Sequence, residues 1–190
     1  MLASGLAEIH QRSQSPTGKF GFHVKTCHGP IVQQVDQWES CWATFYQRHL
    51  RQYMEIASPV IADNEFDNLC RMILDEVVPK LLLPLQENGR ILKPSLIHGD
   101  CWDGNTAIDR GTKRLLLFDA CSFYGHNEYD IGNWRAPRHK ISAAEYVDAY
   151  KECYPVSEPT EDWQARNVLY SLSFNIGNVV NVPHSDQRDV

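Results

Sequence analysis

Residues 98–105 read His-Gly-Asp-Cys-Trp-Asp-Gly-Asn, and this stretch decides the interpretation of the chain. A short apolar run, Leu96-Ile97, precedes it. Two further apolar segments follow at residues 106–108 and 115–118, separated by an Asp-Arg-Gly-Thr sequence that is typical of a hairpin turn. The sequence therefore predicts a short strand, a tight loop and a β-hairpin that ends at Asp119.

Three polar side chains of this region are expected to converge. Asp100 and Asn105 lie in one loop, and the second hairpin strand returns Asp119 to the same end of the hairpin. Phosphoryl transfer from ATP needs a carboxylate near the attacking hydroxyl and hard oxygen ligands for Mg²⁺. The pattern predicts Asp100 as the base, and Asn105 and Asp119 as metal ligands. Gly99 and Gly104 are expected to permit the backbone turns.

Neighbouring residues leave alternatives open. A His-Gly-Asp sequence alone can be a simple turn, and the surrounding strand and hairpin make the functional interpretation specific. Trp102 suits either a stacking platform for substrate or a packing anchor. We expect Asp103 to be solvated, His126 to have a structural or solvent role, and Cys101 and Cys121 to be packing residues.

Composition indicates an ordinary globular domain. The 190 residues are 43% hydrophobic and 22% charged, with a net charge of -6. No basic stripe offsets this charge, which argues against nucleic-acid binding. Six cysteines without a Cys-x-x-Cys pair argue against a zinc ribbon. No apolar run could span a bilayer and no secretory signal opens the chain, so we expect a cytoplasmic protein without a membrane segment.

The remaining pattern is mostly helical, so we predict an α+β fold with one small β-hairpin. Asp36 with Glu39, and Ser142 with Glu145, match the capping-box spacing at helix starts. Pro79 is expected to end or kink a helix. The predicted helices cover residues 1–12, 36–57, 63–78, 142–153 and 160–175, and residues 182–190 are expected to be a loose tail.

The chain resembles the fructosamine kinase (ketosamine-3-kinase) family, within the aminoglycoside-phosphotransferase and choline-kinase-like group. The run Ser122–Tyr129 is its most distinctive part, and Cys121 with Asn127 looks closest to fungal members. The residues that carry the resemblance are Lys19–Phe22, Thr26–Gly29, Gln37-Trp38, His98–Asn105, Phe118-Asp119, Ser122–Tyr129 and Gly132–Arg135.

The resemblance implies ATP-dependent phosphorylation of the 3-hydroxyl of ketosamines on lysine, a repair of glycated proteins. It implies glycated proteins or small ketosamines as partners, and Mg²⁺ with ATP. By the same resemblance Asp100 is the proton acceptor, Asn105 and Asp119 match magnesium ligands, and Trp102 matches an aromatic residue of the substrate pocket. Cys101 departs from the leucine that is usual in this motif.

Kinase-like folds also have an N-terminal β-rich lobe, and nothing before residue 36 supplies its motifs. We therefore expect the C-terminal lobe of a kinase-like fold, residues 1–181, with the N-terminal lobe absent and nucleotide binding severely weakened. Two other functions stay open: a non-catalytic ketosamine-binding module, and a related kinase for an aminoglycoside or choline.

Overall fold

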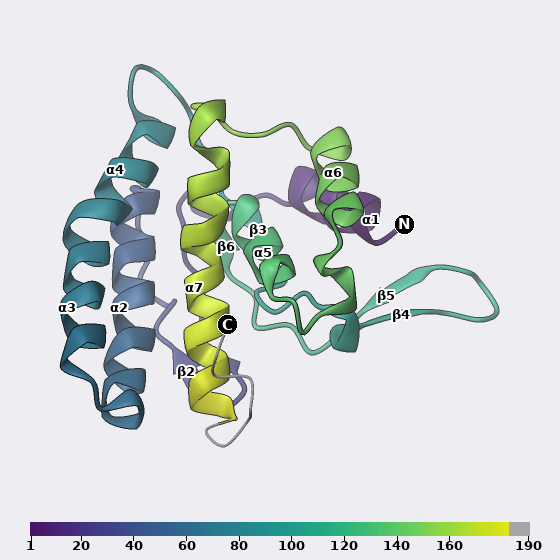
Figure 1. Ribbon diagram of the computed structural model, residues 1–190. Coiled ribbons are helices and arrows are strands. Elements are labelled where there is room, and N and C mark those ends of the chain that lie inside the picture. Colours follow the sequence, from purple (N-terminus) through teal and green to yellow (C-terminus); the bar gives the residue numbers. More distant parts are fainter. Residues whose placement is uncertain (183–190) are drawn as a thin grey trace.

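The computed structural model describes residues 1–182, which form a mostly helical fold with small sheets (Figure 1). This confirms the predicted α+β class. The helices are α1 (Leu2–Arg12), α2 (Trp42–Ile61), α3 (Asn64–Met72), α4 (Val78–Leu82), α5 (Glu128–Gly132), α6 (Ala144–Cys153) and α7 (Trp163–Asn181). The strands are β1 (Thr26–His28), β2 (Ile31–Gln33), β3 (Ser95–Leu96), β4 (Thr106–Ile108), β5 (Leu115–Leu117) and β6 (Tyr124–Gly125).

The helices form two groups with α5 between them. Figure 1 shows α2, α3, α4 and α7 side by side, with α1 and α6 on the other side of α5. Each group has its own apolar core. Tyr129 belongs to the core that contains Trp42 and Tyr170, whereas Ile131 belongs to the core that contains Leu6. The short helix α5 therefore joins both cores.

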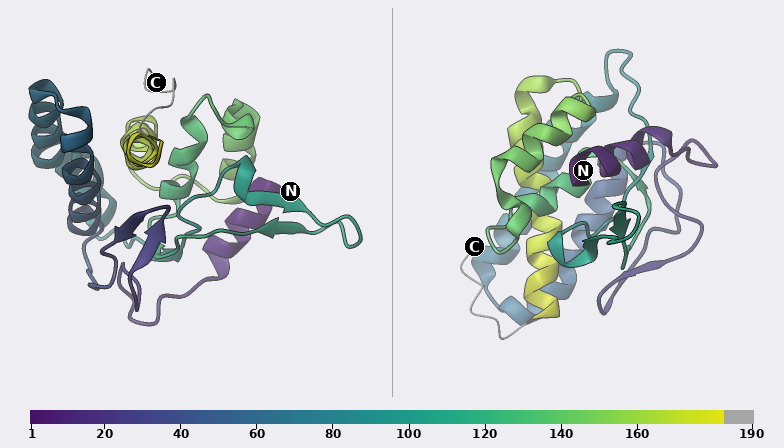
Figure 2. Two further views of the ribbon diagram at one scale, coloured as in Figure 1. Left: turned by 90° about the horizontal axis from the view of Figure 1, so that it is seen from below. Right: turned by 90° about the vertical axis from the view of Figure 1, so that its right-hand side faces the viewer.

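The strands pair as three separate antiparallel ladders, β1 with β2, β3 with β6, and β4 with β5. The predicted hairpin is confirmed, with Thr106 opposite Leu117 and Ile108 opposite Leu115. The Asp109 carboxylate caps its turn by accepting a hydrogen bond from Thr112 N at 2.6 Å. The hairpin extends away from the body of the protein (Figures 1 and 2).

Two predicted helix starts are wrong. Helix α2 begins at Trp42 rather than Asp36, because Glu39 exchanges two backbone hydrogen bonds with Phe20, at 2.8 and 2.9 Å. Glu39 therefore lies in an extended segment and cannot complete a capping box. Helix α6 begins at Ala144 without a side-chain cap, because residues 140–142 form a separate 3₁₀ turn.

The other helices agree with the sequence in outline. Asp63 caps α3 through a 2.8 Å hydrogen bond from Glu65 N. The expected disturbance near Pro79 takes the form of a π-helical turn at Ile73–Val77, which leads into α4. Helix α7 runs to Asn181, further than predicted.

The predicted tail, residues 182–190, lies outside the described residues except for Val182. Within residues 1–182, none of the helices combines the length and the apolar character that a membrane span requires.

Candidate active site around Asp100

A buried carboxylate on α5 anchors the loop that carries Asp100. The side chain of Asp130 accepts hydrogen bonds from His98 N at 2.7 Å and from Gly99 N at 2.8 Å. It also accepts one from His10 Nε2 of α1 at 3.0 Å. Burial raises the pKa of Asp130, but the His10 contact and the His98 amide outweigh it, so the pKa lies below its usual value. Asp130 therefore holds the loop as a buried anion.

Glycine is required at the first turn of this loop. Gly99 has a φ of +84°, and a Cβ atom there would lie 2.6 Å from the carbonyl oxygen of Cys121. The prediction for Gly99 is thus confirmed. Gly104 serves a different purpose, because a Cβ there would overlap the ring of Trp102 at 2.2 Å. It makes room for the indole rather than supplying a left-handed turn.

Two amides hold the Asp100 carboxylate. Asn105 Nδ2 donates to Asp100 Oδ2 at 3.0 Å and to the Asp100 carbonyl at 3.0 Å. Asn133 Nδ2 donates to Asp100 Oδ1 at 3.1 Å. Burial raises the pKa of Asp100, opposed by His28 and by the two amides. The result is an oriented carboxylate with raised proton affinity, which suits a general base.

The end of β5 returns to this loop as predicted. Phe118 N donates to the Asn105 carbonyl at 3.2 Å, and the next residue, Asp119, is exposed with a φ of +58°. Aspartate is among the residues that tolerate this conformation. The charges of both Asp100 and Asp119 act to raise the pKa of His28, although burial outweighs them and lowers it. Asp100 Oδ1 lies 3.7 Å from Nε2 of this imidazole, and the charge of Asp119 also acts on it.

Two oxygen donors are available to a metal ion here. The amide nitrogen of Asn105 is engaged with Asp100, which leaves its Oδ1 as a ligand atom. Asp119 offers an exposed carboxylate. Hard oxygen donors of this kind fit Mg²⁺, which binds few protein ligands and keeps several waters. Residues 1–182 contain no cluster of three or more His, Cys, Asp or Glu side chains that could hold a metal by themselves.

A cavity of about 390 Å³ opens beside Asp100. Trp102 lines it, and the indole packs against His139 with 5.2 Å between ring centroids. Trp102 is therefore placed for both roles that the sequence left open. The remaining lining residues are His28, Asn133, Arg138, His139, Phe174, Asn178, Asn181 and Val182.

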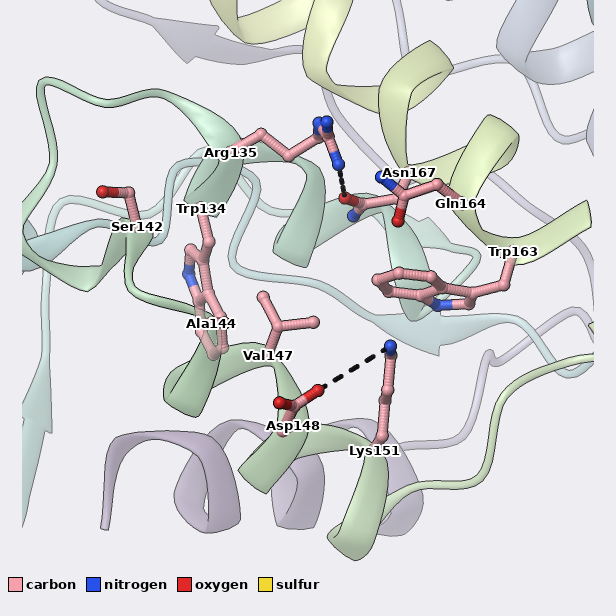
Figure 3. A pocket seen from close by; sticks show the side chains of 10 residues that line it. All are labelled: Trp134, Arg135, Ser142, Ala144, Val147, Asp148, Lys151, Trp163, Gln164 and Asn167. Carbon is pink, nitrogen blue, oxygen red and sulfur yellow. Dashed lines mark hydrogen bonds and ion pairs between the residues drawn. The ribbon is translucent and has the colours of Figure 1, made fainter.

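A second cavity of about 310 Å³ lies between α6 and α7 (Figure 3). Lys151 Nζ lies 3.5 Å from the ring centroid of Trp163, and the other wall includes Trp134. Trp134 Nε1 donates to the Cys101 carbonyl at 3.1 Å. This cavity contains none of the predicted site residues, but Trp134 connects it with the Asp100 loop.

Comparison with known proteins identifies the family. Residues 1–183 match the sequence model of the family described as "Fructosamine kinase". The chain belongs to the fructosamine kinase family. A protein-ribulosamine 3-kinase, chloroplastic, of Oryza sativa subsp. japonica is 30% identical over 173 residues, which are 90% of this chain and 46% of that protein. A ketosamine-3-kinase of Mus musculus is 34% identical over 122 residues, which are 64% of this chain and 37% of that protein.

Two solved structures share the fold. Proteins assigned as fructosamine-3-kinases from Haemophilus somnus 129PT and Thermobifida fusca YX-ER1 superpose with TM-scores of 0.73 and 0.71. Their sequence identities are 22% and 24%, and this chain covers 56% and 59% of theirs while they cover 97% and 98% of it. The fructosamine kinase chain thus spans about half the length of the curated relatives it matches.

Sequence reasoning missed several residues of this fructosamine kinase site. Asp130, Asn133, His28 and Arg138 surround the Asp100 loop. No chemical role was predicted for any of them, although His28 and Asn133 stand in segments that carry the family resemblance. They come from segments distant in sequence, and only the fold brings them together. His126 is structural as predicted, since it is buried between the hydroxyls of Tyr170 and Ser157.

Proposed function

We propose that this chain takes part in ATP-dependent phosphorylation of the 3-hydroxyl of ketosamines, formed when glucose or ribose reacts with lysine amino groups. The observation that carries the proposal is the Asp100 carboxylate, held by Asn105 and Asn133 at the edge of the cavity that Trp102 lines. Membership of the fructosamine kinase family supports the reaction class. The substrate is a glycated protein or a small ketosamine.

In the proposed mechanism, the 3-hydroxyl oxygen of the ketosamine attacks the γ-phosphorus of ATP, and Asp100 accepts the hydroxyl proton. The bond between the γ-phosphorus and the β–γ bridging oxygen breaks, and ADP leaves. Asn133 and Asn105 keep the two carboxylate oxygens oriented during this transfer. Asn105 Oδ1 and Asp119 would hold Mg²⁺, which neutralises charge on the phosphates when bound. Trp102 would lie against the sugar, because aromatic faces bury the apolar side of such rings.

The proposal assigns residues 1–181 to the C-terminal, catalytic lobe of a kinase-like fold. The Asp100 loop and the β4–β5 hairpin, which carry the proposed base and the proposed metal ligands, support this assignment. All six cysteines lie within the described residues and are unpaired there, which supports the predicted cytoplasmic, reducing location.

The test is transfer of γ-phosphate from ATP to a synthetic glycated-lysine peptide in the presence of Mg²⁺. Asp100→Asn keeps the shape of the side chain and removes the base, so we expect turnover to fall at least about 100-fold. Asp148→Asn is the matched control, since this carboxylate is 69% exposed on α6. Absence of transfer by a longer chain that also carries the N-terminal lobe would refute the proposed function, and full activity of Asp100→Asn in that chain would refute the role of Asp100.

A second candidate function is ketosamine binding without transfer, which the cavity favours because its lining combines the Trp102 indole with polar side chains such as Arg138 and Asn178. Titration calorimetry separates the two functions. Binding of a ketosamine without binding of MgATP supports the module, whereas tight MgATP binding excludes it.

A further inference from the structure

His28 of β1 lies next to Asp100, the proposed base, although it is distant in sequence from the loop that carries Asp100. Its Nε2 atom lies 3.7 Å from Asp100 Oδ1, and its Nδ1 atom lies 2.9 Å from the hydroxyl of Tyr53 on α2. Gly177 of α7 faces both rings, because a Cβ there would lie 3.2 Å from His28 and 3.0 Å from Tyr53. The imidazole is thus packed on α7 in a defined position.

The hydrogen-bond partners of Tyr53 point to one position for the proton of this imidazole. Thr26 Oγ1 lies 3.2 Å from Gln33 Oε1 and 3.5 Å from the Cys121 carbonyl oxygen. When it donates to the nearer Gln33 oxygen, Gln33 Nε2 donates to the Tyr53 hydroxyl at 2.9 Å. Because Tyr53 accepts from Gln33, its own proton is free for His28 Nδ1. A neutral imidazole that accepts at Nδ1 carries its proton on Nε2, the atom that faces Asp100.

The same arrangement occurs a second time in the molecule. Asn127 Nδ2 donates to the Tyr150 hydroxyl at 2.9 Å, Tyr150 contacts His10 Nδ1 at 2.7 Å, and His10 Nε2 contacts Asp130 at 3.0 Å. There the amide, the phenol and the imidazole form a chain of hydrogen bonds, and the imidazole makes the last one to the buried carboxylate of Asp130. The string Gln33–Tyr53–His28 has the same order of groups, and its imidazole likewise turns Nδ1 to the phenol and Nε2 to a carboxylate. The distance from Nε2 to the carboxylate is longer here, at 3.7 Å against 3.0 Å.

We propose that His28 is a positioning residue for Asp100. The string Gln33–Tyr53–His28 fixes the ring with its Nε2–H directed at Oδ1 of Asp100, on the side of the carboxylate that also receives Asn133. The N–H dipole, 3.7 Å from Oδ1, attracts the carboxylate and steadies it in the position that borders the cavity. The expected effect of His28 on turnover rests on the proposed function, whereas the position of the proton on its ring does not.

The proton position is tested without any activity measurement. Long-range ¹H–¹⁵N NMR spectra of imidazole rings distinguish protonation at Nε2 from protonation at Nδ1. We expect the Nε2–H form for His28 in the unaltered protein, and a mixture of both forms in Tyr53→Phe, which lacks the phenolic donor. His28→Gln identifies the signals by their loss. The Nδ1–H form in the unaltered protein would overturn the proposal.

The kinetic test compares two substitutions in the phosphotransfer assay. His28→Leu should lower kcat about 10-fold to 100-fold with KM changed less than about threefold, because a disoriented base affects the reaction step and not substrate binding. His28→Gln keeps an N–H donor and should recover most of kcat. His23→Leu, at an exposed histidine of the same segment, should leave both constants unchanged.

The outcomes separate the two proposals. An equal loss of kcat in the Leu and Gln variants would assign His28 to packing alone, and a change confined to KM would make it a substrate contact. Either result overturns the positioning role while the proposed function stands. If the longer chain that also carries the N-terminal lobe transfers no phosphate to a ketosamine, the proposed function fails, and the NMR experiment still decides the position of the proton.

Discussion

Asp130→Asn should destabilise the whole fold, because it removes the acceptor of one or two of three buried hydrogen bonds without changing the shape of the side chain. Oδ2 of Asp130 accepts from His98 N and His10 Nε2, and Oδ1 accepts from Gly99 N. In Asp130→Asn, an NH₂ group replaces one of these oxygens. The asparagine amide can be placed in two orientations, and in each of them its NH₂ group faces at least one buried N–H group, so that neither has an acceptor.

The magnitude follows from the hydrogen bonds that the substitution breaks. A hydrogen bond to a charged group contributes about 1.5–3 kcal/mol, and leaving a buried donor without an acceptor costs about 1–3 kcal/mol more. We therefore expect Asp130→Asn to lower the free energy of unfolding by about 3–5 kcal/mol, a large part of the roughly 5–15 kcal/mol of an ordinary domain. Urea denaturation followed by tryptophan fluorescence measures this quantity. Asp148→Asn, the exposed control, should change it by less than about 0.5 kcal/mol.

The effect should also depend on pH. The folded-state pKa of Asp130 lies below the ordinary value of 3.8, so its contribution is fully present above pH 3.8 and is lost as pH falls through the folded pKa. The difference between the two proteins should therefore be complete at pH 7 and shrink in strong acid. A loss under about 1 kcal/mol at pH 7 would refute the view that Asp130 anchors the loop.

Three further outcomes are expected. Trp134→Phe removes the hydrogen bond to the Cys101 carbonyl and should cost about 1 kcal/mol in urea denaturation; an unchanged midpoint would contradict it. Burial lowers the pKa of His126 to about 4 from 6.5, so the free energy of unfolding should fall by up to about 3 kcal/mol as pH is lowered from 6.5 to 4. The fall should be smaller in His126→Gln, and an equal pH dependence of the two proteins would argue against this. Asp119→Asn should raise the Mg²⁺ concentration for half-maximal phosphotransfer roughly tenfold, and an unaltered requirement would exclude Asp119 as a ligand.

Local patterns in the sequence were enough to predict the centre of this molecule. The spacing from Asp100 to Asn105 and the apolar runs on either side of a turn define a loop and a hairpin through short-range rules. The placement of Asp119 near that loop follows from the antiparallel return of β5. The class of the fold follows from the helical periodicity that dominates elsewhere.

Features that depend on distant partners could not be predicted in this way. Glu39 matches a helix-start pattern, yet pairing with Phe20 holds it in an extended conformation. The strands β1 and β2 are too short to show an alternating pattern, so His28 could not be placed beside Asp100. Asn133 and Asp130 follow a recognisable family motif, but their contacts with the loop depend on how α5 packs between the two cores.

The bond between His10 and Asp130 has a consequence for how the molecule is made. These residues are 120 positions apart, and both hold the loop that carries Asp100. Helix α1 leaves the ribosome well before α5, so His10 must wait for a long stretch of chain before its partner Asp130 exists. Contacts of such separation form late, since a long loop must close first. Catalytic competence should therefore be among the last properties to develop, and intermediates that already contain native helices should be inactive.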